Sequence, residues 1–473
     1  MVFNSLHFAA FFLVVYALYR VLPHRAQNVM LLGASYYFYA AWDWRFLSLL
    51  LGSTIVDYTC ARAIARTGDA ARRRAWLLLS LAFNLGMLGF FKYFDFFAGS
   101  LHDLAALFGW HLSVTTLRVV LPIGISFYTF MTISYVVDVY RRVYQPTDNL
   151  LDFALFVAYF PHLVAGPILR AGSLIPQLQA PRVLRWPQIR EGLWLIAWGL
   201  FQKIYVADNL AKVTQQVFAP GTSPTGLEVL LGVYAFAFQI FGDFAGYTNI
   251  ARGLSKLMGI ELCLNFRAPY FVTSPREFWR HWHISLSEWL RDYLYIPLGG
   301  NKGGEWRVRR NLMITMMLGG LWHGAAWTYV AWGTYQGVVL VAGRGIEKAA
   351  RRAGWTLGEG LTWVRVAMVL VMFHVTCYGW LIFRSGSLAQ IGQLTGALAS
   401  NWRGGAHAAA HAAALASYAL PLLMVHAVEA RKGSLLALLD LRPVWRYGLY
   451  AAVFYLTLLF GDFGGSEFIY FQF

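Results

Sequence analysis

Apolar runs of near membrane-spanning length recur along almost the whole of this 473-residue chain. A helix needs about 20 residues to cross a bilayer core of about 30 Å, and backbone polar groups in lipid must be satisfied inside the helix. With 58% hydrophobic and only 13% charged residues, the composition lies outside the soluble range. We therefore predict an all-α polytopic membrane protein, one domain over 1–473, with roughly ten to twelve membrane segments, some of them half-helices or re-entrant. The apolar windows are 6–22, 30–41, 46–61, 75–98, 118–140, 151–168, 191–207, 227–250, 311–343, 362–383, 416–430 and 446–461.

Basic side chains cluster in the short connections between apolar runs. The positive-inside rule assigns such loops to the cytoplasm, whereas residues 99–117 contain no Lys or Arg and 386–415 contain one. We therefore expect the alternate loops and the C-terminus to face outward. The surplus of 39 basic over 23 acidic side chains does not indicate nucleic acid, because these loops suit anionic membrane lipid or, alternatively, a phosphate-bearing donor. The basic loops are 62–74, 141–142, 170–190, 302–310, 344–352 and 431–446.

The segment 265–325 loses hydrophobicity without becoming loop-like. Ser274 and Pro275 followed by Glu277 supply an N-cap, a proline at the first helical position and a capping-box acid. Trp279 and Trp282 begin an apolar stripe, so the pattern predicts one amphipathic helix, which a proline and two glycines end at 297–300. The glycine-rich stretch 299–305 predicts a turn, since it lacks the GK[ST] ending of a phosphate loop.

Two histidines of this segment, His281 and His283, are two positions apart, which separates them by about 200° around a helix. They cannot hold one metal ion together, and we expect one to face a pocket and the other the polar surface. A second pair, His407 and His411, has the i, i+4 spacing of metal ligands, but it lacks the glutamate of an HExxH motif and a third ligand nearby. We therefore predict no metal site and assign 403–416 to an alanine-rich extracytoplasmic helix.

A further histidine, His323, is expected near the middle of the membrane. The twelve residues from Asn311 to Trp322 rise about 18 Å along a helix, a little over half the hydrocarbon thickness. Gly320 and Gly324 flank the histidine and permit a broken helix or a close helix approach. A titratable group at this depth is costly, so its default interpretation is functional.

Two other histidines in apolar runs are weaker candidates for a catalytic role. His374 lies alone on an apolar helix and is expected to be structural, whereas His162, between two prolines at a helix break, is a candidate to line a cavity. The pKa of an imidazole lies near working pH, which suits a general base. Acyl transfer would use such a base in the membrane, with a thioester donor on the cytoplasmic side and an acceptor hydroxyl on the other.

Several ordered motifs give the chain a family resemblance. "REFWRHWHISLSEWLRDYLYIPLGGN" at 276–301, followed by "GGLWHGAAWTYVAWGTYQG" at 319–337, strongly resembles the membrane-bound O-acyltransferase family, in the branch of the alginate O-acetylation proteins. The likeness covers nearly the whole chain. Further motifs in the same order are "LPIGISFYTF" at 121–130, "YFPHLVAGPILR" at 159–170, "FGDFAGYTNIARG" at 241–253 and "FIYFQF" at 468–473.

The resemblance implies a helical funnel with the catalytic histidine deep inside. The histidine of the family's LWHG motif maps onto His323, and the second polar position maps onto His283 rather than His281. Acetyl-CoA, with no resident cofactor, would supply an acetyl group on the cytoplasmic side of a bacterial inner membrane. An acyl-carrier protein is the alternative donor, because the related D-alanylation protein of teichoic acids uses one.

The resemblance also implies partners outside the membrane. In this branch the immediate acceptor is a separate, serine hydrolase-like extracytoplasmic acyltransferase, which then modifies a polysaccharide; direct transfer to the polysaccharide is the alternative. The chain departs from the branch at Ala245, where serine is common, and at Met131, where glutamine is common. Either change could alter the pocket, so the identity of the acceptor is not carried over.

In the mechanism that these residues suggest, His323 is the general base toward the acceptor hydroxyl. His283 orients the thioester carbonyl or stabilises the oxyanion through its N–H group. The two carboxylates of the expected pocket either line it or pair with Arg280 or Arg291. The expected acyl and donor pocket comprises Trp322, Trp279, Trp282, Trp289, Asp292, Arg280 and Asp243.

Two other classes of function stay open at this point. A transporter, such as a flippase for an acylated lipid-linked sugar, also brings half-helices together around polar residues at mid-membrane. A structural scaffold of a polysaccharide synthesis complex would need no histidine at all. The absence of internal repeats and the family motifs favour the transferase.

Overall fold

The computed structural model describes residues 1–110, 113, 117, 120–164, 166–354, 362–464, 468 and 469. These residues contain no strand, and 78% of them are helical, which confirms the all-α prediction. The structure forms two compact units, one of Met1–Leu193 with Ala251–Cys263, the other of Trp194–Ile250 with Leu264–Phe473. Two helices, α10 (Trp186–Leu200) and α12 (Gly226–Leu257), contribute residues to both units. A single domain over 1–473 stays a prediction.

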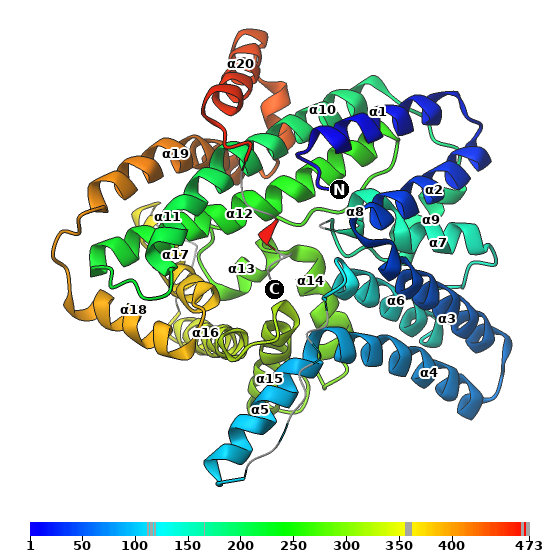
Figure 1. Ribbon diagram of the computed structural model, residues 1–473, viewed down its shortest axis with the longest axis horizontal. Helices are drawn as coiled ribbons and strands as arrows, with labels where there is room; N and C mark the ends of the chain where they lie inside the picture. The colour runs from blue at the N-terminus through cyan, green and yellow to red at the C-terminus, as the bar shows by residue number, and fades with distance from the viewer. Residues whose placement is uncertain are drawn as a thin grey trace. The chain divides into compact units, whose positions relative to one another are not determined.

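The first unit contains the helices drawn from blue to cyan in Figure 1. A buried carboxylate lies at its centre: Asp57 accepts hydrogen bonds from the Ser80 hydroxyl (2.5 Å) and the Asn84 amide (2.9 Å) and so joins α3 to α4. The elements of this unit, besides its parts of α10 and α12, include these two helices. These elements are α1 (Leu6–Val21), α2 (His24–Asp43), η1 (Trp44–Phe46), α3 (Leu47–Arg66), α4 (Ala70–Leu88), η2 (Gly89–Tyr93), α5 (Phe94–Leu107), α6 (Ile125–Tyr140), α7 (Leu150–Ala158), α8 (Phe160–Leu163) and α9 (Ala171–Gln179).

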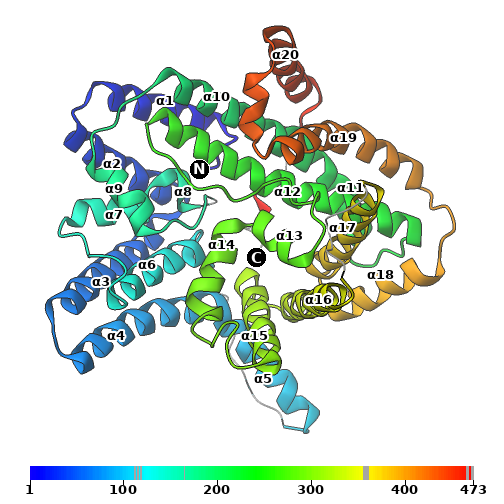
Figure 2. The same ribbon diagram turned by 180° about the vertical axis from the view of Figure 1, so that it is seen from behind.

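The second unit contains the polar segment and the LWHG motif. Figures 1 and 2 both show α13 and α14 between α12 and α15, with α16 beside α13. The elements of this unit, besides its parts of α10 and α12, are η3 (Phe201–Ala207), α11 (Asp208–Phe218), α13 (Pro275–His281), α14 (Ile284–Leu290), η4 (Arg291–Tyr295), α15 (Glu305–His323), α16 (Trp327–Arg352), α17 (Thr362–Arg384), α18 (Leu388–Ser400), α19 (Ala408–Lys432), η5 (Leu435–Asp440) and α20 (Pro443–Phe460).

Among the described residues, five helical stretches are long and apolar enough to cross a membrane. The expected total of roughly ten to twelve segments stays a prediction. Two apolar runs are indeed broken: the run 151–168 into α7 and α8, and the run 311–343 into α15 and α16. The five stretches are His24–Arg66, Ala70–Leu107, Gly226–Leu257, Thr362–Arg384 and Ala408–Lys432.

The polar segment differs from its prediction at one residue. It begins as expected, because Ser274 caps α13 by accepting from the Glu277 N–H (3.2 Å) and Pro275 occupies the first turn. The predicted single helix, however, is interrupted between α13 and α14, where His283 adopts a left-handed backbone conformation that a right-handed helix cannot contain. The turn at 299–305 is confirmed.

Close contact between α15 and α16 rests on two facing glycines. A Cβ atom on Gly320 would lie 2.9 Å from the Cα of Gly333, and one on Gly333 would collide with the Met316 carbonyl oxygen. Small residues allow two helix backbones to approach in this way. The close approach predicted for Gly320 is therefore present, and it fixes the position of the residues that follow on both helices.

Candidate active site

His283 lies fully buried at the break between α13 and α14, with φ 41° and ψ 56°. For a residue other than glycine, this left-handed backbone conformation costs roughly 1–2 kcal/mol of conformational free energy. Such a conformation persists where the surroundings determine it, and it concentrates at functional sites. The strained backbone thus marks His283 as a residue whose position matters more than local helix stability.

Asn265 forms hydrogen bonds with the residues that directly follow this break. Its backbone carbonyl accepts from the Ile284 N–H (2.9 Å), and its side-chain Oδ1 accepts from the N–H (3.2 Å) and the hydroxyl (2.7 Å) of Ser285. The His283 carbonyl in turn accepts from the Ser287 N–H (3.0 Å) and begins α14. These bonds tie the two residues after His283 to the preceding loop and tie His283 itself to the first turn of α14.

The imidazole of His283 lies in an aromatic shell that three separate segments supply. Phe244 of α12 packs edge-to-face against it with ring centroids 4.7 Å apart. Phe266 of the preceding loop lies at 6.4 Å, and Trp322 of α15 at 6.0 Å. The shell excludes water from the ring, which strengthens any hydrogen bond that the imidazole makes there.

His323 ends α15 and has a similar aromatic surrounding. It is 4% exposed, and three rings meet it edge-to-face: Trp322 and Trp332 at 5.1 Å, and Phe383 at 5.5 Å. Because Trp322 also contacts His283, one indole lies against both imidazoles. The two histidines are close enough to interact electrostatically.

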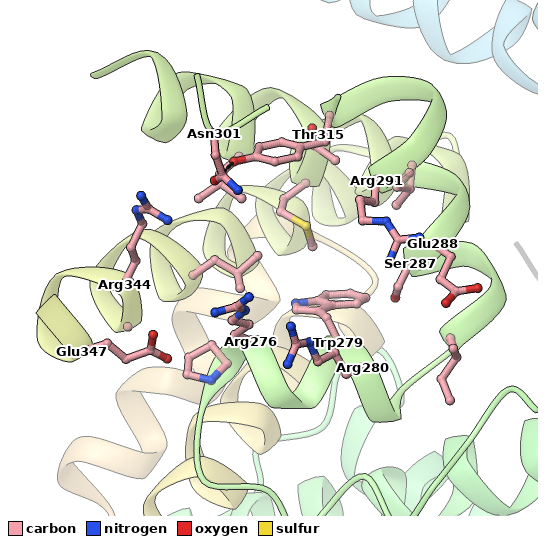
Figure 3. Close-up of a pocket in the computed structure, with 18 residues that line it drawn as sticks. Arg276, Trp279, Arg280, Ser287, Glu288, Arg291, Asn301, Thr315, Arg344 and Glu347 are labelled. Carbon is pink, nitrogen blue, oxygen red and sulfur yellow. Dashed lines mark hydrogen bonds between the residues drawn. The ribbon is translucent and has the colours of Figure 1, made fainter. Parts of the chain in front are cut away.

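A cavity of about 760 Å³ opens beside these aromatic residues. Figure 3 shows Arg276, Trp279 and Arg280 projecting from α13 toward its middle, with Asn301 and Thr315 on the opposite wall. Four arginines and two glutamates line it. Arg291 and Arg344 are paired with acids outside the lining, which leaves Arg276 and Arg280 as the cations best placed to meet an anionic ligand. The charged residues of the lining are Arg276, Arg280, Glu288, Arg291, Arg344 and Glu347.

Trp279 connects this pocket to His323. Neither catalytic candidate histidine is among the residues that line the pocket. Trp279, however, forms part of its wall and packs edge-to-face on Trp332 at 6.0 Å, and Trp332 contacts His323. The basic pocket and the buried histidines are therefore separated by a wall of two indoles.

The residues predicted to form the acyl and donor pocket lie in several different places in the structure. Of these residues, Trp279 and Arg280 line the cavity. Trp282 is buried in the core, stacked on Phe278 at 5.7 Å, and Trp289 packs on Tyr293 at 5.2 Å. Trp322 lies between the two histidines rather than in the lining. The expected role of each residue in the pocket stays a prediction.

The two predicted carboxylates form ion pairs. Asp292 accepts from the guanidinium of its neighbour Arg291 at 2.7 Å, one of the pairings expected from the sequence. Asp243 pairs instead with Lys203 at 2.9 Å, so the expected partners Arg280 and Arg291 were wrong for this residue. Their positions on α13 and η4 suggested them, but a buried lysine in η3 lies directly against α12.

Lys203 makes a second buried ion pair with Asp208 at 2.8 Å. The side chains of Lys203, Asp208 and Asp243 are all at most 4% exposed. Asp243 also accepts from the backbone N–H of Ile469 at 2.6 Å. The motif "FIYFQF" at 468–473 lies outside the described residues except for its first two. The ion pairs join η3, α11 and α12, and so position Phe244.

The remaining buried histidines are held by backbone groups or a side chain. His162 donates from Nε2 to the Phe156 carbonyl at 3.0 Å. His374 donates from Nδ1 to the Leu370 carbonyl at 2.7 Å and accepts at Nε2 from the Tyr234 hydroxyl at 2.6 Å. The structural role expected for His374 fits these bonds. His162 is bonded to the backbone and is not among the residues that line the two cavities beside α13.

The pair at 407 and 411 does not assemble a metal site in the described structure. His411 contacts the Gln216 amide oxygen at 2.9 Å through Nε2, and the rings of His407 and His411 stack 6.0 Å apart. In the described ranges no three His, Cys, Asp or Glu side chains gather closely enough to hold a metal ion. Helix α19 begins at Ala408, which confirms a helix within 403–416.

Sequence reasoning missed most of the shell around the two imidazoles. Phe244 and Trp332 lie inside the quoted motifs, so the motifs held the signal, but nothing local distinguishes them from other aromatic residues. Phe383 and Asn265 lie outside those motifs. Lys203, a lone lysine in an apolar run, was detectable as a buried charge in need of a partner.

Comparisons with known proteins agree with this geometry. The model of the MBOAT, membrane-bound O-acyltransferase family, matches residues 143–385. The chain is 43% identical over 392 residues to the probable alginate O-acetylase AlgI of Pseudomonas aeruginosa, covering 82% of this chain and 73% of that protein. It is 35% identical over 420 residues to the peptidoglycan O-acetyltransferase of Helicobacter pylori, covering 82% and 78%. Similarity to the teichoic acid D-alanyltransferase of Bacillus subtilis is 27% over 282 residues, covering 55% and 68%.

Proposed function

Because the chain belongs to the membrane-bound O-acyltransferase family and is an O-acyltransferase, we propose that it moves an acetyl group across a bacterial inner membrane. The donor is a cytoplasmic thioester, acetyl-CoA, and the final acceptor is a hydroxyl of an extracytoplasmic polysaccharide. Transfer occurs directly or through a serine hydrolase-like partner acyltransferase. The relatives support this class of acceptor, since two of them carry the names of alginate and peptidoglycan acetylation.

The observation that carries the proposal is the placement of two buried histidines against one tryptophan. His323 and His283 come from different elements, both are at most 4% exposed, and both contact Trp322. An ionisable side chain buried in the apolar part of a membrane protein is costly to place there, and such residues are mostly retained for function. A reaction that needs proton transfer at this depth accounts for both.

The transfer step assigns one role to each histidine. His323 removes the proton from the acceptor hydroxyl while the hydroxyl oxygen forms a bond to the thioester carbonyl carbon. The N–H of His283 stabilises the negative charge that develops on the carbonyl oxygen. The carbon–sulfur bond then breaks, the thiolate leaves with the proton from His323, and the acetyl ester remains on the acceptor.

The arginine-lined pocket supports a phosphate-bearing donor. Coenzyme A carries several phosphate charges, and arginine is the side chain best suited to bind phosphate. Arg344 and Asn301 of this pocket lie in or beside loops that the positive-inside rule assigns to the cytoplasm. An acyl-carrier protein would present its thioester on a phosphorylated arm, and the same arginines suit it.

The test measures ester-linked acetyl groups on extracellular and cell-wall polysaccharide in cells that carry wild type or His323→Ala. We expect esters to fall to background in the variant, with normal protein level in the membrane. His407→Ala, at an exposed histidine of the same unit, is the matched control and should leave the esters unchanged. Persistent esters in His323→Ala would favour the transporter or scaffold.

The donor is tested in inside-out membrane vesicles supplied with labelled acetyl-CoA or with an acetylated carrier protein. Label on the wild-type protein, its partner or the polysaccharide from acetyl-CoA alone supports coenzyme A as the donor. Label from the acetylated carrier protein alone would show that the carrier protein, and not coenzyme A, is the donor. The His323→Ala vesicles should remain unlabelled with either thioester.

A further inference from the structure

We propose that a groove between α13, α16 and α17 binds one anionic phospholipid from the membrane leaflet beside the basic loops. The inference goes beyond acyl transfer and does not depend on it; Arg276 and Arg280 line both this groove and the neighbouring donor pocket, whereas Arg351 and the α17 wall belong to the groove alone. The groove has a volume of about 840 Å³, and all of its lining belongs to one compact unit. Three stretches contribute: 273–280, 339–351 and 363–375.

One wall of the groove is an apolar face of α17. Trp363, Val371 and Met368 line it, and the first two are 67% and 65% exposed. The twelve steps from Trp363 to Val375 span about 18 Å of helix, close to half of a hydrocarbon core of about 30 Å. The wall thus has the length of one leaflet, and it belongs to a helix that is apolar enough to cross the membrane.

The lining of the groove also contains basic side chains. Arg276, Arg280 and Arg351 line it and are exposed. Two acids are also present, but Glu277 is engaged by the N–H (2.7 Å) and hydroxyl (2.9 Å) of Thr273, which leaves Glu347 against three arginines. Basic pockets between membrane helices at the cytoplasmic face suit phosphate head groups.

Contacts between α16 and α17 lie next to Val375, the last lining residue of α17. The Tyr335 hydroxyl of α16 donates to the Val375 carbonyl of α17 at 2.7 Å, and Tyr335 lies against Gly379 so closely that an added Cβ would be 3.2 Å from its ring. Pro275 of α13 packs against Gly343 of α16. A groove that combines arginine side chains with an apolar helix face matches a single phospholipid, whose phosphate meets the arginines while an acyl chain lies along α17.

A phospholipid bound in this groove would stabilise the position of α13. That helix carries Arg276 and Arg280, and it leads directly into the strained residue His283. Trp279 of the same helix forms the wall of the neighbouring cavity. A bound lipid therefore stabilises the helix on which the candidate active site depends, without contacting either histidine.

The test uses the full-length protein, delipidated in detergent, and follows its Tm as phosphatidylglycerol, phosphatidylcholine or inorganic phosphate is added. A ligand that binds only the folded state raises Tm by an amount that grows with the logarithm of its concentration divided by its Kd. We expect a saturable rise with phosphatidylglycerol and little change with the other two. Arg351→Glu and Ala367→Trp, which reverse the charge and fill the groove, should each weaken the affinity about tenfold or more.

Matched controls lie one residue away from each change. Arg352→Glu and Val366→Trp alter exposed residues that do not line the groove, and the affinity should stay within about twofold of wild type. His323→Ala should bind the lipid like wild type, which separates this site from the reaction. Equal shifts with phosphatidylcholine, equal shifts with inorganic phosphate, or equal losses in the variants and their neighbours would each overturn the proposal.

Discussion

At the scale of single residues, His283 combines two demands that one side chain rarely meets. Its backbone requires a left-handed conformation, which glycine and asparagine adopt more easily than alanine. Its side chain supplies an N–H group inside an aromatic shell. Substitutions can separate these demands, because glycine satisfies the backbone alone and asparagine satisfies the backbone and retains an N–H donor.

We expect His283→Gly to be more stable than His283→Ala by about 1 kcal/mol, since both lose the ring but only alanine keeps the strain. Both should abolish polysaccharide esters, and His283→Asn should retain more activity than either. The measurements are Tm of the purified variants and ester content of the cells. Normal esters with His283→Gly would remove this histidine from the mechanism, and higher stability of the alanine variant would contradict the left-handed backbone.

At the scale of helices, the contact between α15 and α16 positions His323 against Trp332. Gly333 directly follows Trp332, and a Cβ there would meet the Met316 carbonyl oxygen and lie 3.0 Å from the Met317 Cα. Backbone atoms cannot move aside as a flexible side chain can, so the helices themselves must separate.

Gly333→Ala should therefore lower the free energy of unfolding by about 1–3 kcal/mol and reduce acetylation, because Trp332 moves away from His323. Gly345→Ala on the same helix is the control, since an added Cβ meets nothing within 4 Å. That substitution should be neutral or stabilising by up to about 1 kcal/mol. Equal stability of the two variants would show that the helices tolerate separation at this point.

The buried ion pairs of Lys203 join three further elements, η3, α11 and α12. Lys203→Met leaves two carboxylates, Asp208 and Asp243, without their cation and should cost about 3–5 kcal/mol. Lys212→Met removes an ion pair with Asp462 in which the lysine is 61% exposed, and it should cost at most about 1 kcal/mol. The measurement is the free energy of unfolding of the two variants in detergent. If Lys203→Met lost as little stability as Lys212→Met, the buried carboxylates would not need the charge of Lys203.

At the scale of the whole molecule, the alternation of basic and uncharged loops predicts the orientation in the membrane. With the native cysteines replaced, a cysteine at Arg403 should react with a membrane-impermeant thiol reagent in intact cells. A cysteine at Lys302 should react only after permeabilisation. Both positions are exposed, so accessibility within the protein does not separate them, and the reverse pattern would invert the proposed direction of transfer.

The sequence by itself determined the all-α membrane class, the start of the helix at Ser274, the turn at 299–305 and the choice of His323 as a candidate. Each of these follows from hydrophobicity, capping or helical rise along a continuous stretch of chain, which are local properties.

The tertiary structure alone decided the environment of that candidate. The left-handed backbone of His283, the contacts of Phe244 and Phe383 with the two imidazoles and the pairing of Asp243 with Lys203 join residues far apart in the chain. Periodicity cannot specify such contacts, because the packing of the surrounding helices selects which aromatic or charged side chain among many comes to lie against a given residue. The break within the predicted helix also depends on tertiary contacts, because hydrogen bonds from Asn265 hold a backbone conformation that the local sequence disfavours.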